Sequence, residues 1–140
     1  MNDALFVYGT LVDPATWRRI SGRHDYGEPA WLDGWQARPV SGRPWPGLVE
    51  TPGGRVAGLL YRGITPAMWR RLDAYEGAPY QRVRVWVRLS DGQCRAAWAY
   101  RWRPRYGSAL AHGAWQLSAA KRGRRRRTMR LFLHTRESDR

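Results

Sequence analysis

The sequence predicts an α+β domain in which short strands curl into a small barrel and helices pack against it. Three observations support this class. The chain has 140 residues, enough for one compact core and too few for two ordinary domains. Strand patterns outnumber helix patterns, and two helix signals that begin at a proline interrupt them. The strand patterns cover residues 4–8, 31–40, 48–50, 56–61, 80–89 and 95–102.

The first half of the chain predicts one helix among short strands. Residues 4–8 form a continuous apolar run, which is typical of a buried strand. Asp13 and Pro14 supply an N-cap and a first-turn proline for a helix that runs to about Ile20. Residues 41–47 form a loop rich in Pro and Gly, and residues 48–50 form a brief strand. A turn at residues 52–54 then predicts a separate strand at residues 56–61.

The second half predicts a helix followed by a hairpin. Thr65 and Pro66 repeat the cap and proline signal, and the helix is expected to end at Gly77. Residues 80–89 alternate almost strictly between apolar and polar, and residues 91–92 form the turn into a returning strand. One face holds Val83, Val85, Val87 and Leu89, and the other holds Arg82, Arg84, Trp86 and Arg88. Trp115 and the apolar cluster at residues 129–133 are expected to tie the tail to the body.

The positive charge is concentrated at the C-terminus. The net charge is +14, and residues 101–140 contribute 12 basic and 2 acidic side chains to it. Clustered guanidinium groups bind phosphate oxygens, so this segment predicts contact with a polyanion. The residues concerned are Lys121, Arg122, Arg124, Arg125, Arg126 and Arg127. Arginine accounts for 24 of the 25 basic residues, an excess that GC-rich coding also produces.

The sequence lacks the motifs that define several classes of enzyme and binding protein. The sequence contains no GxSxG elbow, phosphate-binding P-loop or GxGxxG turn. The single cysteine, Cys94, excludes an intrachain disulfide framework and is expected to be a buried structural thiol. The three histidines show no zinc-binding spacing, so no metal and no cofactor is expected. No apolar run is long enough to span a membrane and no signal peptide is evident, so a cytoplasmic location is the expectation.

Two features remain that could carry chemistry. The turn Tyr8-Gly9-Thr10-Leu11 follows the first strand, and its backbone N–H groups could bind an anion or an oxyanion. Glu76 ends the second helix on its apolar side, where loss of solvent would raise its pKa. By themselves, these features are more often an ordinary turn and a solvated helix end than parts of a functional site.

Four segments in order resemble the γ-glutamylcyclotransferase-like family, in its γ-glutamylamine cyclotransferase branch, which includes the plant avirulence-induced proteins. The segments are FVYGTL at residues 6–11, WPGLV at residues 45–49, VAGLLY at residues 56–61 and LDAYEGAPYQR at residues 72–82. The resemblance implies a small mixed β-barrel with flanking helices over residues 1–118. Residues 119–140, the Arg-rich C-terminal extension, lie outside it.

The resemblance also implies the site and the reaction. Glu76 would be the catalytic acid and base, and the substrate-binding residues would be Tyr8, Gly9, Thr10, Leu11, Pro46, Gly47 and Tyr80. The substrate's own α-amino group would attack its γ-carbonyl carbon, releasing an amine and 5-oxoproline, so the protein needs no nucleophile. Two alternatives stay open: a non-catalytic ligand-binding member of the same fold, and a phosphate or nucleic-acid binding module that uses the Arg-rich tail and surface tryptophans.

Overall fold

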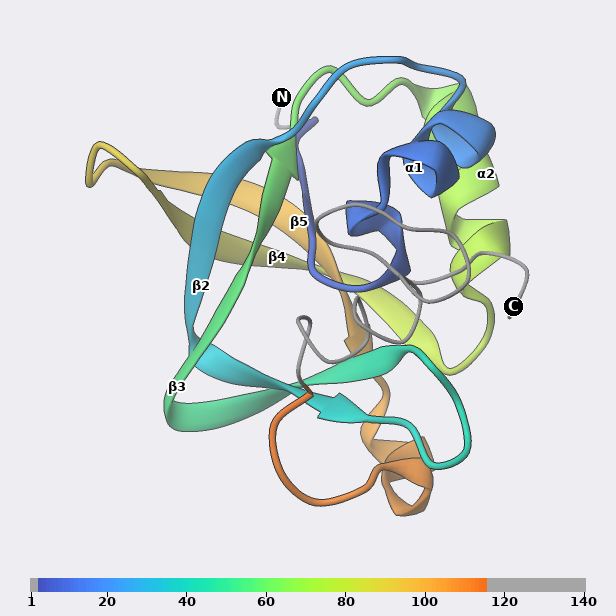
Figure 1. Ribbon diagram of the computed structural model, residues 1–140, viewed down its shortest axis with the longest axis vertical. Coiled ribbons are helices and arrows are strands. Elements are labelled where there is room, and N and C mark those ends of the chain that lie inside the picture. Colours follow the sequence, from blue (N-terminus) through green and yellow to red (C-terminus); the bar gives the residue numbers. More distant parts are fainter. Residues whose placement is uncertain (1–2, 116–140) are drawn as a thin grey trace, which may run out of the picture.

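The strands close into a barrel in the order β1-β3-β2-β4-β5 in the computed structural model, which describes residues 3–115 (Figure 1). Strand β1 pairs antiparallel with β3 and parallel with β5, so the barrel is mixed. The predicted class, a small mixed β-barrel with flanking helices, is therefore confirmed. The strands are β1 (Leu5–Val7), β2 (Glu28–Pro39), β3 (Pro46–Tyr61), β4 (Tyr80–Leu89) and β5 (Cys94–Trp102).

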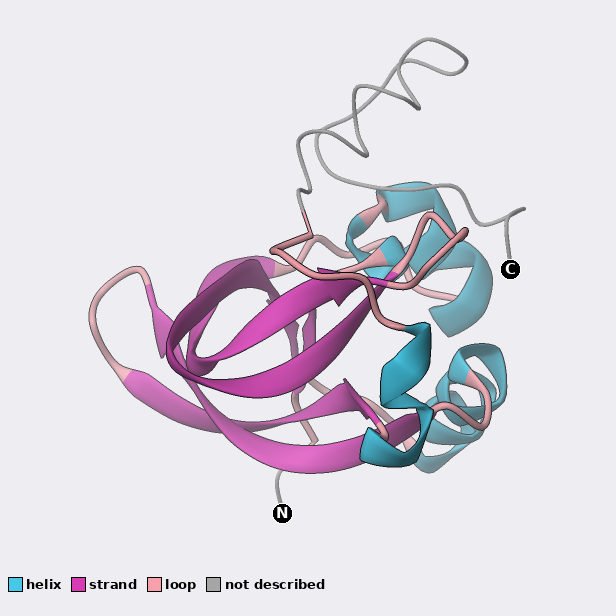
Figure 2. Cartoon of the chain, turned by 90° about the horizontal axis from the view of Figure 1, so that it is seen from below, coloured by secondary structure: helices cyan, strands magenta, loops and turns pink. Residues whose placement is uncertain are grey.

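Helices α1 (Pro14–Ser21) and α2 (Pro66–Glu76) lie together on one side of the barrel (Figures 1 and 2). Both predicted N-caps are confirmed: an Asp13 carboxylate oxygen accepts from the Thr16 amide, and the Thr65 hydroxyl oxygen accepts from the Met68 amide. Gly77 ends α2 at φ 83°, a conformation that favours glycine. Two short 3₁₀ helices, η1 (Thr10–Val12) and η2 (Pro104–Ala109), complete the elements.

The apolar side chains form two clusters, one on each side of the barrel wall. One contains only side chains from the strands and adjoining loops, including Phe6 and Leu32, and fills the barrel. The other joins the outer side of the wall to the helices, where Trp17 of α1 stacks on Tyr61 with 3.8 Å between ring centroids. Strand β1 is therefore buried on both faces, which explains its unbroken apolar run.

Residues 46–61 form one long strand rather than the two short strands predicted. Strand β3 pairs with β2 through residues 46–50 and 55–60, and the register shifts between the pairs Asp33↔Arg55 and Trp35↔Glu50. The turn-like residues 51–54 are therefore an irregularity within the strand and do not end it. A Cβ on Gly54 would collide with the Trp35 carbonyl oxygen, so glycine permits the close approach of the two backbones. Bulges of this kind bend long strands and help to close barrels.

The hairpin of β4 and β5 has the predicted turn, but Cys94 is exposed at the start of β5. The expectation of a buried thiol was wrong because the end of the hairpin projects beyond the barrel, on the side away from the helices (Figure 1). The Trp115 amide donates to the Ala37 carbonyl, as expected for a residue that ties the tail to the body. The basic residues 121–127 and the cluster at residues 129–133 lie outside the described residues. Among those described, no helix is long and apolar enough to cross a membrane.

Candidate active site

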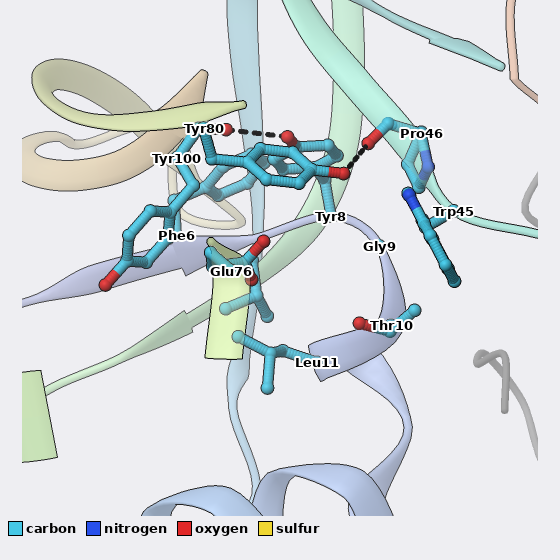
Figure 3. Close-up of a pocket in the computed structure, with 11 residues that line it drawn as sticks. Phe6, Tyr8, Gly9, Thr10, Leu11, Trp45, Pro46, Glu76, Tyr80 and Tyr100 are labelled. Atoms are coloured by element: carbon cyan, nitrogen blue, oxygen red, sulfur yellow. Dashed lines mark hydrogen bonds between the residues drawn. The ribbon is translucent and has the colours of Figure 1, made fainter. Parts of the chain in front are cut away.

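A pocket opens where β1 passes into η1 (Figure 3). Four other segments complete its wall: the start of β3, the end of α2, the start of β4 and strand β5. The lining residues are Phe6, Val7, Tyr8, Gly9, Thr10, Leu11, Trp45, Pro46, Glu76, Tyr80 and Tyr100.

Among residues 3–115, Glu76 is the only carboxylate that lines this wall, and no lysine, arginine or histidine lines it. The residue is partly buried at the last position of α2. Its side chain points into the pocket, between Leu11 and the tyrosine rings (Figure 3). A carboxylate in this position can exchange a proton with a bound ligand.

Two hydrogen bonds hold the last turn of α2, which carries Glu76, against the barrel. The Tyr75 and Thr10 hydroxyl oxygens are 2.8 Å apart, which joins the helix to η1. The Tyr100 hydroxyl donates to an Asp73 carboxylate oxygen at 2.6 Å, which joins it to β5. Residues on both sides of Glu76 are therefore attached to other walls of the same pocket.

Two buried tyrosines join further parts of the wall through hydrogen bonds to backbone carbonyls. The Tyr8 hydroxyl donates to the Tyr100 carbonyl at 2.6 Å, and the Tyr80 hydroxyl donates to the Pro46 carbonyl at 2.6 Å (Figure 3). The first bond joins the end of β1 to β5, and the second joins the start of β4 to the start of β3. Both rings are thereby fixed as pocket walls.

The turn after β1 presents backbone donors near the pocket. The first hydrogen bonds of η1 run from the Val12 amide to the Gly9 carbonyl and from the Asp13 amide to the Thr10 carbonyl. The N–H groups of residues 9–11 therefore lie at the N-terminal end of this helix, where backbone donors point out of the helix. Because all three residues line the pocket, these groups are suitable donors to an anionic oxygen.

Negative charge and burial shape the electrostatics beside the pocket. Burial raises the pKa of the Tyr100 hydroxyl far above its ordinary value, and its hydrogen bond to Asp73 and the negative charges of Asp73 and Glu76 raise it further. This tyrosine therefore stays protonated and keeps donating to Asp73. Within residues 3–115, no group of three or more His, Cys, Asp or Glu side chains is arranged to hold a metal ion.

The structure brings together all but one of the site residues predicted from the sequence. Glu76, the turn at residues 8–11, Pro46 and Tyr80 line the one pocket. Gly47 does not line it: a Cβ there would lie 2.9 Å from side-chain atoms of Trp102 and Leu110, so this position faces the packed core. Gly47 is therefore not proposed as a substrate contact.

Sequence reasoning missed Tyr100, Phe6, Val7 and Tyr75 as parts of the site. Phe6 and Val7 belong to the motif that contains Tyr8, so their place in the wall could have been inferred from it. Tyr75 adjoins Glu76, but its position in the apolar pattern of α2 gave no sign of its hydrogen bond. Tyr100 approaches the pocket only because β5 closes the barrel against β1, and no local pattern predicts that contact.

Comparison with known proteins agrees with this arrangement. The family described as "Gamma-glutamyl cyclotransferase, AIG2-like" matches residues 5–117. The chain belongs to this family. Its matched segment contains every residue that lines the pocket.

Plant members of the AIG2-like family are similar in sequence and in fold. AIG2-like protein A of Arabidopsis thaliana is 30% identical over 129 residues, which are 91% of this chain and 78% of that protein. Protein AIG2 C of the same plant is 34% identical over 87 residues, 62% of this chain, and the match spans only 53% of its length. A solution structure of another A. thaliana protein superposes with a TM-score of 0.69 at 29% identity, covering 89% of this chain and 83% of that one.

Proposed function

We propose that this protein cyclises a small γ-glutamyl amine or amide to 5-oxoproline and releases the free amine. Membership of the family supports a function of the γ-glutamyl cyclotransferase type. The observation that supports it most strongly is that the Glu76 carboxylate and the turn at residues 8–11 line one small pocket.

In the proposed reaction the substrate supplies the nucleophile. Its α-amino nitrogen attacks its γ-carbonyl carbon, the new C–N bond closes a five-membered lactam, and the bond to the leaving amine breaks. Glu76 accepts a proton from the attacking nitrogen and returns it to the leaving nitrogen, so the proton count balances. The rigid walls formed by Tyr8 and Tyr80 hold the glutamyl arm folded, which provides the rate advantage of an intramolecular reaction.

The negative oxygens of the substrate need hydrogen-bond donors. No cationic side chain from the described part of the chain lines the pocket, so the proposed donors are the backbone N–H groups of residues 9–11. They would hold either the substrate α-carboxylate or the oxygen that becomes negative in the tetrahedral intermediate.

A panel of γ-glutamyl amides and amines, with 5-oxoproline release as the readout, tests the proposal. We expect release from at least one member, and none from the same compound with an acetylated α-amino group, because acetylation removes the nucleophile. Binding of the panel without release would instead favour a ligand-binding protein of this fold. Equal release from the free and the acetylated compound would contradict attack by the substrate's own amine.

A further inference from the structure

A row of arginine and tryptophan side chains lies outside the proposed active site, on the outer side of the β4–β5 hairpin. Residues 83, 85, 87 and 89 of β4 face the barrel interior, so the residues between them face outward. We call this surface the arginine–tryptophan face. It consists of Arg82, Arg84, Trp86, Arg88, Ala96 and Trp98.

Three of its arginines stack on indole rings. The Arg82 guanidinium carbon lies 4.3 Å from the ring centroid of Trp69 on α2 and 5.4 Å from that of Trp98. The corresponding distance from Arg84 to Trp98 is 5.1 Å. Arg88 lies over Trp31 of the neighbouring strand β2 at 5.6 Å. Stacking leaves the N–H edge of a guanidinium available for hydrogen bonding.

Arg84 differs from its neighbours in its ion pairs. Arg82 is paired with Asp73, and Arg88 makes two hydrogen bonds to Asp33, so carboxylates occupy both. For Arg84 no carboxylate partner is found in residues 3–115, and its side chain is exposed. Its five N–H donors can therefore bind a phosphate.

Trp86 stands beside Arg84 on the same face and is 69% exposed. Its cross-strand neighbour is Ala96, which covers little of the ring. Alternate residues of a strand are about 7 Å apart, so the indole and the guanidinium present a flat ring next to a cation. Proteins that bind single-stranded nucleic acid combine these two features, because bases stack on aromatic rings while cations contact the backbone.

We propose that the arginine–tryptophan face binds single-stranded nucleic acid, with a base stacked on Trp86 and a phosphate bound by Arg84. A lipid surface fits less well, because membrane contact needs several apolar side chains together. The other exposed large apolar side chains among the described residues, Tyr26 and Tyr106, lie in different segments of the chain.

The test is titration of a fluorescein-labelled oligothymidylate with the full chain, followed by anisotropy at several salt concentrations. Trp86→Ala should weaken binding roughly tenfold, since stacking of one base is worth about that much. Arg84→Gln should make the plot of log K against log salt less steep by about one unit, the amount expected for the loss of one phosphate contact. Arg84→Lys should restore the steeper slope. Tyr26→Ala, which removes an exposed ring elsewhere on the protein, should leave the affinity unchanged.

Two further measurements separate this proposal from a general attraction to anions. Heparin, which has no bases to stack, should bind equally to the parent protein and Trp86→Ala. Circular dichroism should show that the variants fold. The proposal is overturned if Trp86→Ala binds the oligonucleotide as tightly as Tyr26→Ala does. It is also overturned if phosphatidylserine vesicles bind the face through Trp86 while the oligonucleotide does not.

Discussion

Gly9 lies where a single methyl group would change the pocket. A Cβ at this position would be 2.9 Å from Cδ and 3.2 Å from Cγ of Pro46, and both residues line the pocket. Gly9→Ala should therefore displace Pro46, lower kcat/KM and cost about 1–3 kcal/mol of stability. Activity assays and urea unfolding would check both effects. Gly107→Ala is the matched control, because a Cβ there would meet nothing within 4 Å.

Gly47, a neighbour of Pro46, should behave differently although it belongs to the same sequence motif. Its Cβ would press on Trp102 in the core, so Gly47→Ala should lose stability by a similar amount. The Gly47→Ala molecules that are folded should keep a near-normal KM. A large rise in KM without loss of stability would show that Gly47 contacts the substrate after all.

Exposure of Cys94 makes a separate prediction for a single side chain. Because the thiol lies on the surface at the end of the hairpin, native protein should react with a thiol reagent about as fast as urea-unfolded protein. With a disulfide reagent that releases a coloured thiol, absorbance measures both rates. Strong protection in the native state would mean that the thiol is covered.

At the scale of an element, the end of α2 should depend on its two hydrogen bonds to the barrel. Tyr75→Phe removes the contact with Thr10, and Tyr100→Phe removes the contact with Asp73. Each should lower stability by roughly 1–2 kcal/mol and lower kcat with little change in KM, because the substitution loosens the residue that carries the proton. Tyr106→Phe, an exposed tyrosine outside the pocket, is the control. Equal kcat values in all three variants would show that the bonds do not position Glu76.

Elements whose signals are local could be predicted from the sequence, and the others could not. Both α-helices were predicted almost to the residue, because Asp13 and Thr65 cap them through neighbouring amides. Strand β3 was divided in two because Pro and Gly at residues 52–54 are turn signals. Its continuity depends on pairing with β2 on both sides of that point, and this pairing is a property of the closed barrel.

For the whole molecule, buried tyrosines predict a loss of stability in alkali. Burial raises the pKa of Tyr61 from its ordinary value of 10.0 to about 12, and burial together with Asp73 also raises the pKa of Tyr100. Below pH 10 both hydroxyls are protonated whether the chain is folded or unfolded, so their full contribution to the free energy of unfolding is present. Above it the unfolded chain releases protons that the folded chain keeps, so stability should fall as pH rises.

Urea unfolding at a series of pH values between about 8 and 11 measures this loss. Tyr61→Phe keeps the stacking partner of Trp17 and removes the titrating group, so its stability should vary less with pH over the same interval. An identical slope in Tyr61→Phe and the parent protein would assign the alkaline loss to other groups.

The site could be predicted only in part, for a reason that also belongs to the whole molecule. Glu76 and the turn at residues 8–11 stand in recognisable motifs, and barrel closure brings them to one pocket. The order in which the strands pair brings Tyr100, Trp45 and Tyr80 to the wall of this pocket. Gly47 does not line this pocket, because proximity in sequence to Pro46 does not fix the direction in which a residue faces.

The rate of 5-oxoproline release by Glu76→Gln tests the central claim most directly. Gln keeps the size of the side chain but cannot accept and return a proton, so the rate should fall about a hundred- to ten-thousand-fold while the fold and substrate binding persist. Glu50→Gln, which changes an exposed carboxylate outside the pocket, should keep the full rate. A Glu76→Gln protein that retains more than about a tenth of the parent rate would contradict the assignment of proton transfer to Glu76.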